Sequence, residues 1–191
     1  MSQLVGHTYL TLVTDIDAGT VEYVADDRTT ESLDGYFEAI PVEQRAGIQA
    51  VAMDMWQPYI NSTHAHLPGA GDKIVFDRFH IMGYMGKAVD TVRKREHKAL
   101  RAAGDDTLTK TKYLWVYAEE NLPERHRERF EALRDADLKT ARAWAIKENL
   151  RLLWDYLRRG WATRHWKDWY FWATHSRLQP VIDAARTIHR H

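Results

Sequence analysis

Two short apolar runs, each followed directly by an aspartate, are the feature that most constrains the fold of this chain. They lie at residues 48–53 and 74–76, and the carboxylates that follow them are Asp54 and Asp77. Apolar runs of this length are typical of buried strands, and residues 55–66 between them are predicted to form a short helix. An aspartate at the carboxyl end of a strand can hold a metal ion at a sheet edge, or it can cap the next helix. Spacing alone leaves both interpretations open.

The segments on either side of this stretch differ in character. Residues 7–14 and 20–25 are rich in β-branched and aromatic side chains, which predicts an antiparallel hairpin turning at residues 15–19. A helix capped by Thr29 or Thr30 is expected to run to about residue 40. This order of strands and helices predicts an α/β fold with a mixed sheet. Almost everything after Asp77 is predicted to be helical.

Composition restricts the class of protein. Of the 191 residues, 45% are hydrophobic and 28% are charged, which indicates a soluble globular protein. Neither a signal peptide nor an apolar run of the roughly 18 residues needed to cross a membrane is visible. The absence of cysteine excludes disulfides and thiolate metal sites and fits a cytoplasmic protein. Because 27 basic residues balance 27 acidic ones, any nucleic-acid binding must come from a local patch.

Carboxylates at the ends of the predicted strands are the candidate metal ligands. They are Asp54, Asp77 and the pair Asp15 and Asp17, and such oxygen donors suit Mg²⁺ or Mn²⁺ better than zinc. Two such ions about 4 Å apart are the usual machinery of phosphodiester cleavage. The sequence Asp-Ile-Asp-Ala-Gly favours ordinary turn chemistry for Asp15 and Asp17. Asp54 and Asp77 therefore remain the better candidates.

The motif that begins at Asp77 holds two further candidates. Arg78 is predicted to hold a phosphate and His80 to lie near a scissile group. The alternative is that Arg78 neutralises Asp77 while His80 packs at the start of a helix. His64 and His66 lie two positions apart, a poor spacing for one metal ion, and are expected to be surface residues.

A basic helix and a tryptophan-rich tail follow. The helix could follow a nucleic-acid backbone, although charged helix faces are more often simply solvated. Its candidate DNA-binding residues are Lys87, Arg93, Lys94, Arg95 and Lys98. The aromatic side chains of the tail could stack on bases, but their spacing favours the core of a helical subdomain. These are Trp154, Trp161, Trp169 and Trp172.

Two of these segments together resemble a known family. The strings VAMDMWQPYI and, about twenty residues later, IVFDRFHIMGYMGKAVDTVRKRE closely resemble segments of the ISL-three group of insertion-sequence transposases. The hairpin and the downstream helices are similar as well, so the likeness covers essentially the whole chain. It implies an RNase H-like domain with an Asp-Asp-Glu triad, two Mg²⁺ ions and a helical insertion. By this resemblance Asp54 matches the second triad aspartate, and Asp77, Arg78 and His80 match a motif close to the site.

The resemblance also predicts what the 191 residues leave out. The first aspartate of the triad is expected just upstream of Met1, and the glutamate beyond the last residues. Residues 1–85 are accordingly expected to form part of the RNase H-like core, without its first strand, and residues 86–191 the helical insertion. Alternatively, the hairpin could pair with the strand before Asp54 and bring Asp15 or Asp17 to the position of the first aspartate.

These expectations define a function and its alternatives. The prediction is a truncated DDE transposase domain that is inactive in this form. It descends from enzymes that cleave DNA and transfer strands at the ends of an insertion sequence. Its expected partners are transposon-end DNA and a second copy of the chain in a homo-oligomer, with no membrane. One alternative is a non-catalytic DNA-binding or dimerising remnant that modulates an intact transposase, and another is a decayed gene product without function.

Overall fold

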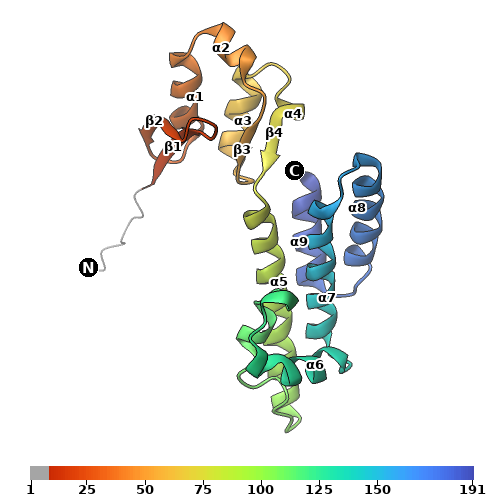
Figure 1. Cartoon of the computed structure of the whole chain (residues 1–191). Helices are drawn as coiled ribbons and strands as arrows, with labels where there is room; N and C mark the ends of the chain where they lie inside the picture. Colours follow the sequence, from red (N-terminus) through yellow and green to blue (C-terminus); the bar gives the residue numbers. More distant parts are fainter. Residues whose placement is uncertain (1–8) are drawn as a thin grey trace, which may run out of the picture. The chain divides into compact units, whose positions relative to one another are not determined.

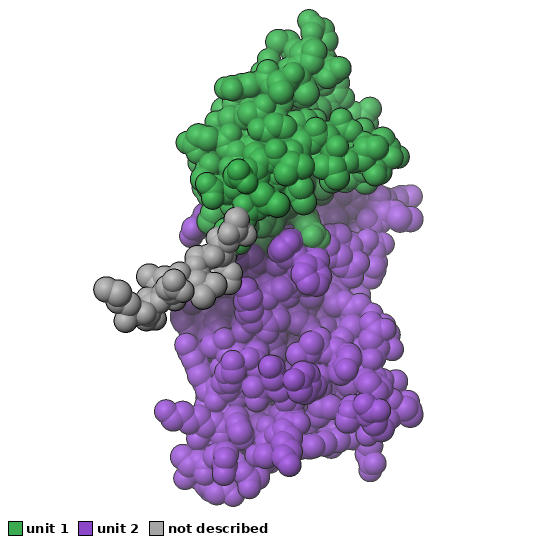
Figure 2. All heavy atoms as spheres, turned by 90° about the vertical axis from the view of Figure 1, so that its left-hand side faces the viewer, with its two compact units in different colours: residues 1–77 green, residues 78–191 purple. Residues whose placement is uncertain are grey.

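The computed structural model describes residues 9–191, so the first two residues of the predicted hairpin, His7 and Thr8, lie outside the described part. The chain divides into two units, Met1–Asp77 and Arg78–His191, which Figure 2 shows in green and purple. We call them the sheet unit and the helical unit and describe each by itself. The roles predicted for residues 1–85 and 86–191, catalytic core and insertion, stay predictions.

The sheet unit contains four strands and four helices within its described residues (Figure 1). In chain order they are β1 (Leu10–Asp15), β2 (Thr20–Asp26), α1 (Thr30–Ala39), α2 (Val42–Gly47), β3 (Val51–Met53), α3 (Gln57–His66), α4 (Ala70–Lys73) and β4 (Ile74–Phe76). The mixed α/β content predicted from the sequence is confirmed. The prediction did not include α2 or α4.

The four strands form two separate sheets in the part of the chain that is described. Strands β1 and β2 are antiparallel, whereas β3 and β4 are parallel. The single mixed sheet that we expected is therefore absent from residues 9–191. Among the described strands, β1 and β2 pair with each other and not with β3, so the hairpin does not bring Asp15 or Asp17 onto β3. Strands β3 and β4 contribute three residues each and pair with one another.

Helix α1 forms as its sequence predicts. The Thr29 hydroxyl accepts a hydrogen bond from the Ser32 amide at 3.3 Å, and the Ser32 side chain reaches back to the Thr29 amide. This reciprocal cap satisfies amides at the helix start that have no partner within the helix. The helix buries Leu33 and Phe37 and lies against α3, which buries Ile60. The two helices give the sheet unit its apolar core.

One histidine of α3 departs from the prediction. His66 was expected at the surface, but it is half-buried, its Nε2 lies 3.1 Å from Asp34 Oδ1, and its ring stacks on Phe37. The helical spacing of α3 turns His66 toward α1, while His64 remains exposed. His66 therefore helps to join the two helices.

The helical unit consists of five α-helices and four 3-10 helices. They are α5 (Arg78–Ala102), η1 (Lys112–Trp115), η2 (Glu119–Asn121), η3 (Glu124–His126), α6 (Arg127–Asp135), α7 (Lys139–Arg151), η4 (Leu152–Asp155), α8 (Arg159–Thr174) and α9 (Gln179–Arg190). Helix α5 lies along α7 and α9 (Figure 1). It ends before Gly104, whose φ of +80° suits a helix terminus. No helix among residues 9–191 is long and apolar enough to cross a membrane.

The tryptophans of the helical unit are divided between core and surface. Trp169 is 1% exposed, and its indole N–H donates to the Ile146 carbonyl at 2.8 Å, so this part of the prediction is confirmed. Trp154 is half-buried. Trp161 and Trp172 are 55% and 39% exposed, so placing them in the core was wrong. Helical spacing showed that the aromatic residues cluster but did not show which face of α8 the other helices cover.

A glutamate of α5 caps the start of α7. Residue Leu138 at the N-terminus of α7 has no side chain that can accept a hydrogen bond. Glu96 supplies the acceptors instead, for the amides of Lys139 and Thr140, each at 2.7 Å, and for the Thr140 hydroxyl at 2.6 Å. A carboxylate at a helix N-terminus also interacts favourably with the helix dipole. Glu96 thereby ties α7 to α5.

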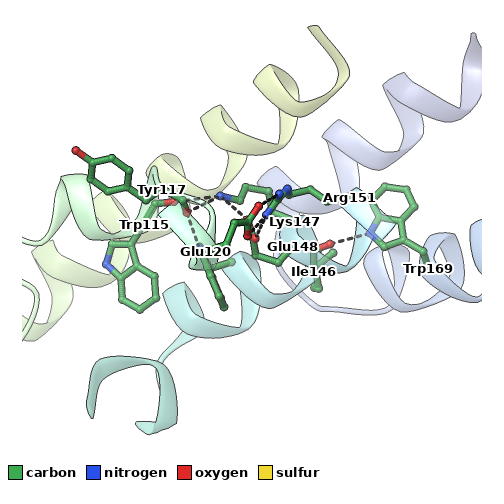
Figure 3. A network of polar contacts seen from close by, with 9 residues as sticks. Trp115, Tyr117, Glu120, Ile146, Lys147, Glu148, Arg151 and Trp169 are labelled. Carbon is green, nitrogen blue, oxygen red and sulfur yellow. Dashed lines mark hydrogen bonds and ion pairs between the residues drawn. The ribbon is translucent and has the colours of Figure 1, made fainter. Parts of the chain in front are cut away.

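A polar network joins the 3-10 segment, residues 112–121 with η1 and η2, to α7 (Figure 3). The Lys147 ammonium lies 3.4 Å and 3.5 Å from the carbonyl oxygens of Trp115 and Tyr117, and 2.9 Å from a Glu148 oxygen. Burial lowers the pKa of Lys147. Arg151, one turn later, bonds to Glu148 at 2.6 Å and also to Glu120. The hydrogen bonds from Arg151 hold the pKa of Glu120 at about 2.

We expect Trp169→Ala to destabilise the helical unit by about 3–5 kcal/mol, because it removes a fully buried indole and leaves a cavity. Trp172→Ala on the same helix should cost less than about 1 kcal/mol, because its side chain is 39% exposed. Urea unfolding followed by far-UV circular dichroism measures both. Equal destabilisation by the two variants would contradict the assigned core.

The Glu120–Arg151 pair predicts a dependence of stability on pH. Because the pKa of Glu120 falls from its ordinary 4.5 to about 2 on folding, its contribution is complete above pH 4.5. That contribution is lost as the pH falls from 4.5 toward 2. We expect Glu120→Gln to make unfolding less steeply pH-dependent in this range, by up to about 1 kcal/mol for a pair near the surface.

The measurement is urea unfolding at several pH values. Glu128→Gln, which removes one carboxylate from an exposed position of α6, is the matched control. A pH profile that Glu120→Gln leaves unchanged would contradict the assignment.

Candidate functional site

The pairing of β3 with β4 brings two predicted site residues to the same edge of a sheet. Met53 and Phe76 are partners in the parallel register, so Asp54 and Asp77 are the residues directly after the two strands. The Asp77 amide donates to the Met53 carbonyl at 3.0 Å, which continues the ladder by one step. Neighbouring strands lie about 4.8 Å apart, and parallel strands end at a common edge. The role of the two aspartates as metal ligands stays a prediction.

The two oxygens of the Asp54 carboxylate have different environments. Oδ2 accepts a hydrogen bond from the Arg28 guanidinium in a half-buried ion pair. Oδ1 is buried and has no hydrogen-bond partner among residues 9–191. A buried acceptor without a partner costs about 1–3 kcal/mol, and most buried polar atoms in native proteins are satisfied. An oxygen left in this state marks a place where a ligand would be stabilising.

Three hydrogen bonds hold the backbone around Arg28 in place. The Asp27 amide donates to the Tyr9 carbonyl at 2.9 Å, and the Thr11 hydroxyl donates to the Asp27 carbonyl at 2.8 Å. The Trp56 indole donates to the Arg28 carbonyl at 2.9 Å. Asp27 itself has a φ of +67°, an uncommon conformation for a non-glycine residue that its neighbours hold in place. The end of β2 is thereby joined to the segment that follows Asp54.

The Arg28 side chain lies on an aromatic surface. Its guanidinium carbon is 4.3 Å from the centre of the Trp56 ring and 5.9 Å from that of Tyr9, distances typical of cation–π contacts. Arg28 was not among the site residues predicted from the sequence. Its partner Asp54 lies 26 positions further along the chain, and no local pattern links the two. The sequence showed only a basic residue three positions after the end of a predicted strand.

The donors at this edge suit a hard divalent cation, although the described set is incomplete. Within residues 9–191 no group of three or more histidine, aspartate or glutamate side chains is placed to hold a metal ion. Asp54 and Asp77 would supply two oxygen ligands. Mg²⁺ commonly takes one or two carboxylates and fills its remaining positions with water or phosphate oxygens. Asp54 Oδ1, which lacks a partner within the described part of the chain, is consistent with such an ion.

The other predicted carboxylates serve the hairpin turn. Asp15 Oδ1 accepts from the amides of Asp17 and Ala18, both at 2.9 Å, and the turn is exposed. Gly19 closes the turn with a φ of +68°. This geometry agrees with the interpretation of Asp15 and Asp17 as turn residues.

The start of α5 holds the two candidates of the motif after Asp77. The Arg78 guanidinium lies 5.0 Å from the Trp154 ring, within the helical unit. His80 meets the ring of Phe79 edge-on, with ring centres 5.7 Å apart. The three residues that follow Asp77 in the motif, Arg78 to His80, are exposed. Phosphate binding by Arg78 and a position near the scissile group for His80 stay predictions.

The five residues of α5 from Lys87 to Lys98 that were predicted to bind DNA separate into an exposed group and one buried member. Arg93 is 8% exposed and donates two hydrogen bonds to Asp90, at 3.0 Å and 2.8 Å, so it does not share the exposed surface. Lys94 also pairs with Asp90 but remains exposed. The exposed members, here called the basic stripe, are Lys87, Lys94, Arg95 and Lys98.

Comparisons with known proteins place the chain in a family. A family model described as "Transposase", of the ISL3 type with a DDE domain, matches residues 2–191. The transposase of insertion sequence element IS1001 from Bordetella parapertussis is 30% identical over 186 residues, which cover 96% of this chain. The transposase of IS1557 from two strains of Mycobacterium tuberculosis is 24% identical over 209 residues and 97% of the chain.

The aligned regions are about half of each relative. The chain spans 45% of the IS1001 protein and 46% of the IS1557 proteins. No solved structure matches the chain. Because the family model covers nearly every residue, the chain belongs to the ISL3 family of DDE transposases.

Proposed function

We propose that this segment supplies the second aspartate of the catalytic triad of an insertion-sequence transposase. The whole protein would cleave DNA at the ends of its element and join those ends to a new site. The observation that carries the proposal is the placement of Asp54 at the carboxyl edge of a parallel strand pair, beside Asp77, with one buried oxygen that has no hydrogen-bond partner among residues 9–191. In an RNase H-like core, which we also propose, β3 and β4 would be adjacent strands of a larger sheet.

The residues present suggest how the segment would contribute to chemistry. Asp54 and Asp77 would hold the divalent cations, which supply an activated water and stabilise the leaving oxygen in phosphodiester cleavage. The β3–β4 register fixes the spacing of the two carboxylates. Trp56 orders the turn after Asp54 through its hydrogen bond to the Arg28 carbonyl. In this proposal Trp56 and the β3–β4 pairing orient the two carboxylates that would bind the cations. The remaining carboxylates of the triad would come from other parts of a full-length transposase.

We further propose that residues 86–191 are the insertion of this catalytic domain and that the basic stripe contacts transposon-end DNA. Lys87, Lys94, Arg95 and Lys98 are all exposed along one helix of 25 residues. Lysine and arginine side chains along a DNA backbone replace condensed counterions and so provide sequence-independent affinity. Arg78 and His80 would add contacts at the start of the same helix.

The second candidate function is DNA binding without catalysis. Its support is that the basic stripe belongs to a unit with its own apolar core, whereas only one residue of the triad is assigned within the 191 residues. A polypeptide of these residues alone would then bind DNA, dimerise or interfere with an intact transposase, and would not cleave. Cleavage by the isolated 191-residue polypeptide that requires Asp54 would exclude this alternative.

We predict that Asp54→Asn in a full-length transposase containing this segment lowers Mg²⁺-dependent cleavage of element-end DNA by at least about 100-fold. Loss of an outer partner of a metal ligand already costs about 10- to 100-fold, so loss of a ligand should cost more. Asp17→Asn, which alters the exposed hairpin turn, should retain activity and is the matched control. The assay is strand cleavage on labelled end DNA, and full activity of Asp54→Asn would contradict the proposal.

The basic stripe predicts a change in the salt dependence of DNA binding. We expect Lys94→Gln, Arg95→Gln and Lys98→Gln, combined in the 191-residue chain, to weaken binding and to reduce the slope of log K against log salt. The reduction should approach about 0.9 for each phosphate that these side chains no longer neutralise. Gel shifts at several salt concentrations measure the slope.

The matched control replaces three exposed arginines of α7 and α9 by glutamine, namely Arg142, Arg186 and Arg190. It removes the same charge from elsewhere in the helical unit. Equal slopes for the two triple variants would show that general charge, and not the stripe, attracts the DNA.

A further inference from the structure

We propose that Arg28 is a counter-ion that competes with the divalent cation for Asp54 and so sets the affinity of the site. This inference rests on the proposed role of Asp54 as a metal ligand. In the folded sheet unit the Arg28 guanidinium donates a hydrogen bond to the Asp54 carboxylate. A cation must displace the guanidinium in order to bind there. Arg28 is therefore a positioning residue of the transposase site, acting through Asp54.

Neither oxygen of Asp54 is open to a cation while Arg28 is in place. Oδ2 bonds to the guanidinium, and Oδ1 is buried. A hard cation binds carboxylate oxygens directly, so it needs at least one of these positions. Oδ1 would gain a partner from a cation, but it is shut off from solvent. A cation can therefore reach this carboxylate only when the Arg28–Asp54 hydrogen bond opens.

The surroundings of Arg28 hold it in place without depending on Asp54. The guanidinium lies over Trp56 and near Tyr9, and the Arg28 carbonyl accepts from the Trp56 indole. Because these contacts involve the ring face and the backbone, the side chain can exchange the carboxylate for water and remain on the aromatic surface. The pair can therefore open without unfolding the turn at the end of β2.

Charge decides which partner is favoured. The ion pair is half-buried, with 32% and 24% of the two side chains exposed, so the attraction is screened only in part. A divalent cation carries twice the charge of the guanidinium and repels it once bound. Two ligands that exclude each other are linked reciprocally, so removing Arg28 must raise the affinity of Asp54 for the cation.

The test is Mn²⁺ binding to the 191-residue chain, measured from the electron paramagnetic resonance signal of the free ion. We expect Arg28→Gln to bind Mn²⁺ about five to ten times more tightly than the unmodified chain, at the low end of typical coupling between two sites. Arg28→Lys keeps the charge but not the planar fork, so a smaller gain is expected. A merely structural role for Arg28 predicts the opposite sign, namely weaker binding.

Asp54→Asn and the double variant Arg28→Gln/Asp54→Asn complete the experiment, with far-UV circular dichroism to confirm folding. The gain from Arg28→Gln should vanish in the double variant. Binding that depends on Asp54 but is unchanged or weakened by Arg28→Gln would overturn the competition and leave the metal role of Asp54 intact. Binding that is independent of Asp54, or absent even in Arg28→Gln, would overturn both.

Discussion

The parallel pairing of β3 with β4 is the constraint on which the candidate site depends. Three residues on each strand fix the register that carries Asp54 and Asp77 to a common edge. Because the two strands are short, contacts from segments outside this sheet also help to hold the site. The Trp56 indole and the Arg28 guanidinium join the segment after β3 to the end of β2. A shift of register by one residue would separate the two carboxylates and undo these contacts.

The helical unit is organised by different interactions. Its core contains buried apolar side chains from all five α-helices and from η1, and polar groups join α7 to α5 and to residues 115–120. Glu96 of α5 caps α7, and Lys147 reaches the carbonyls of Trp115 and Tyr117. Buried charges of this kind add little net stability, because burial costs them their hydration, but removing one partner would leave the other uncompensated. The basic stripe lies on the exposed face of α5, and the buried face of the same helix packs against α7 and α9.

Much of the local structure could be predicted from the sequence, because its signals are local. The apolar triplet before Asp77 became β4, the cap at Thr29 became the start of α1, and Gly104 follows the end of α5. The resemblance of two motifs identified the family, which the comparisons confirm.

The missed features depend on contacts between distant segments. The Arg28–Asp54 pair, the separation of the strands into two sheets, the burial of Arg93 and the exposure of Trp161 are set by tertiary packing. A helical period gives the spacing of side chains along an element, but it does not say which face a neighbour will cover.

The position of a bound cation in crystals of a longer transposase containing this segment tests the role of Asp54 most directly. Crystals grown with Mn²⁺ and measured at the manganese absorption edge would locate the ion by its anomalous scattering. We predict a manganese ion ligated directly by Asp54, with the Arg28 guanidinium displaced from the carboxylate. Manganese bound elsewhere, with Arg28 still paired to Asp54, would contradict this role.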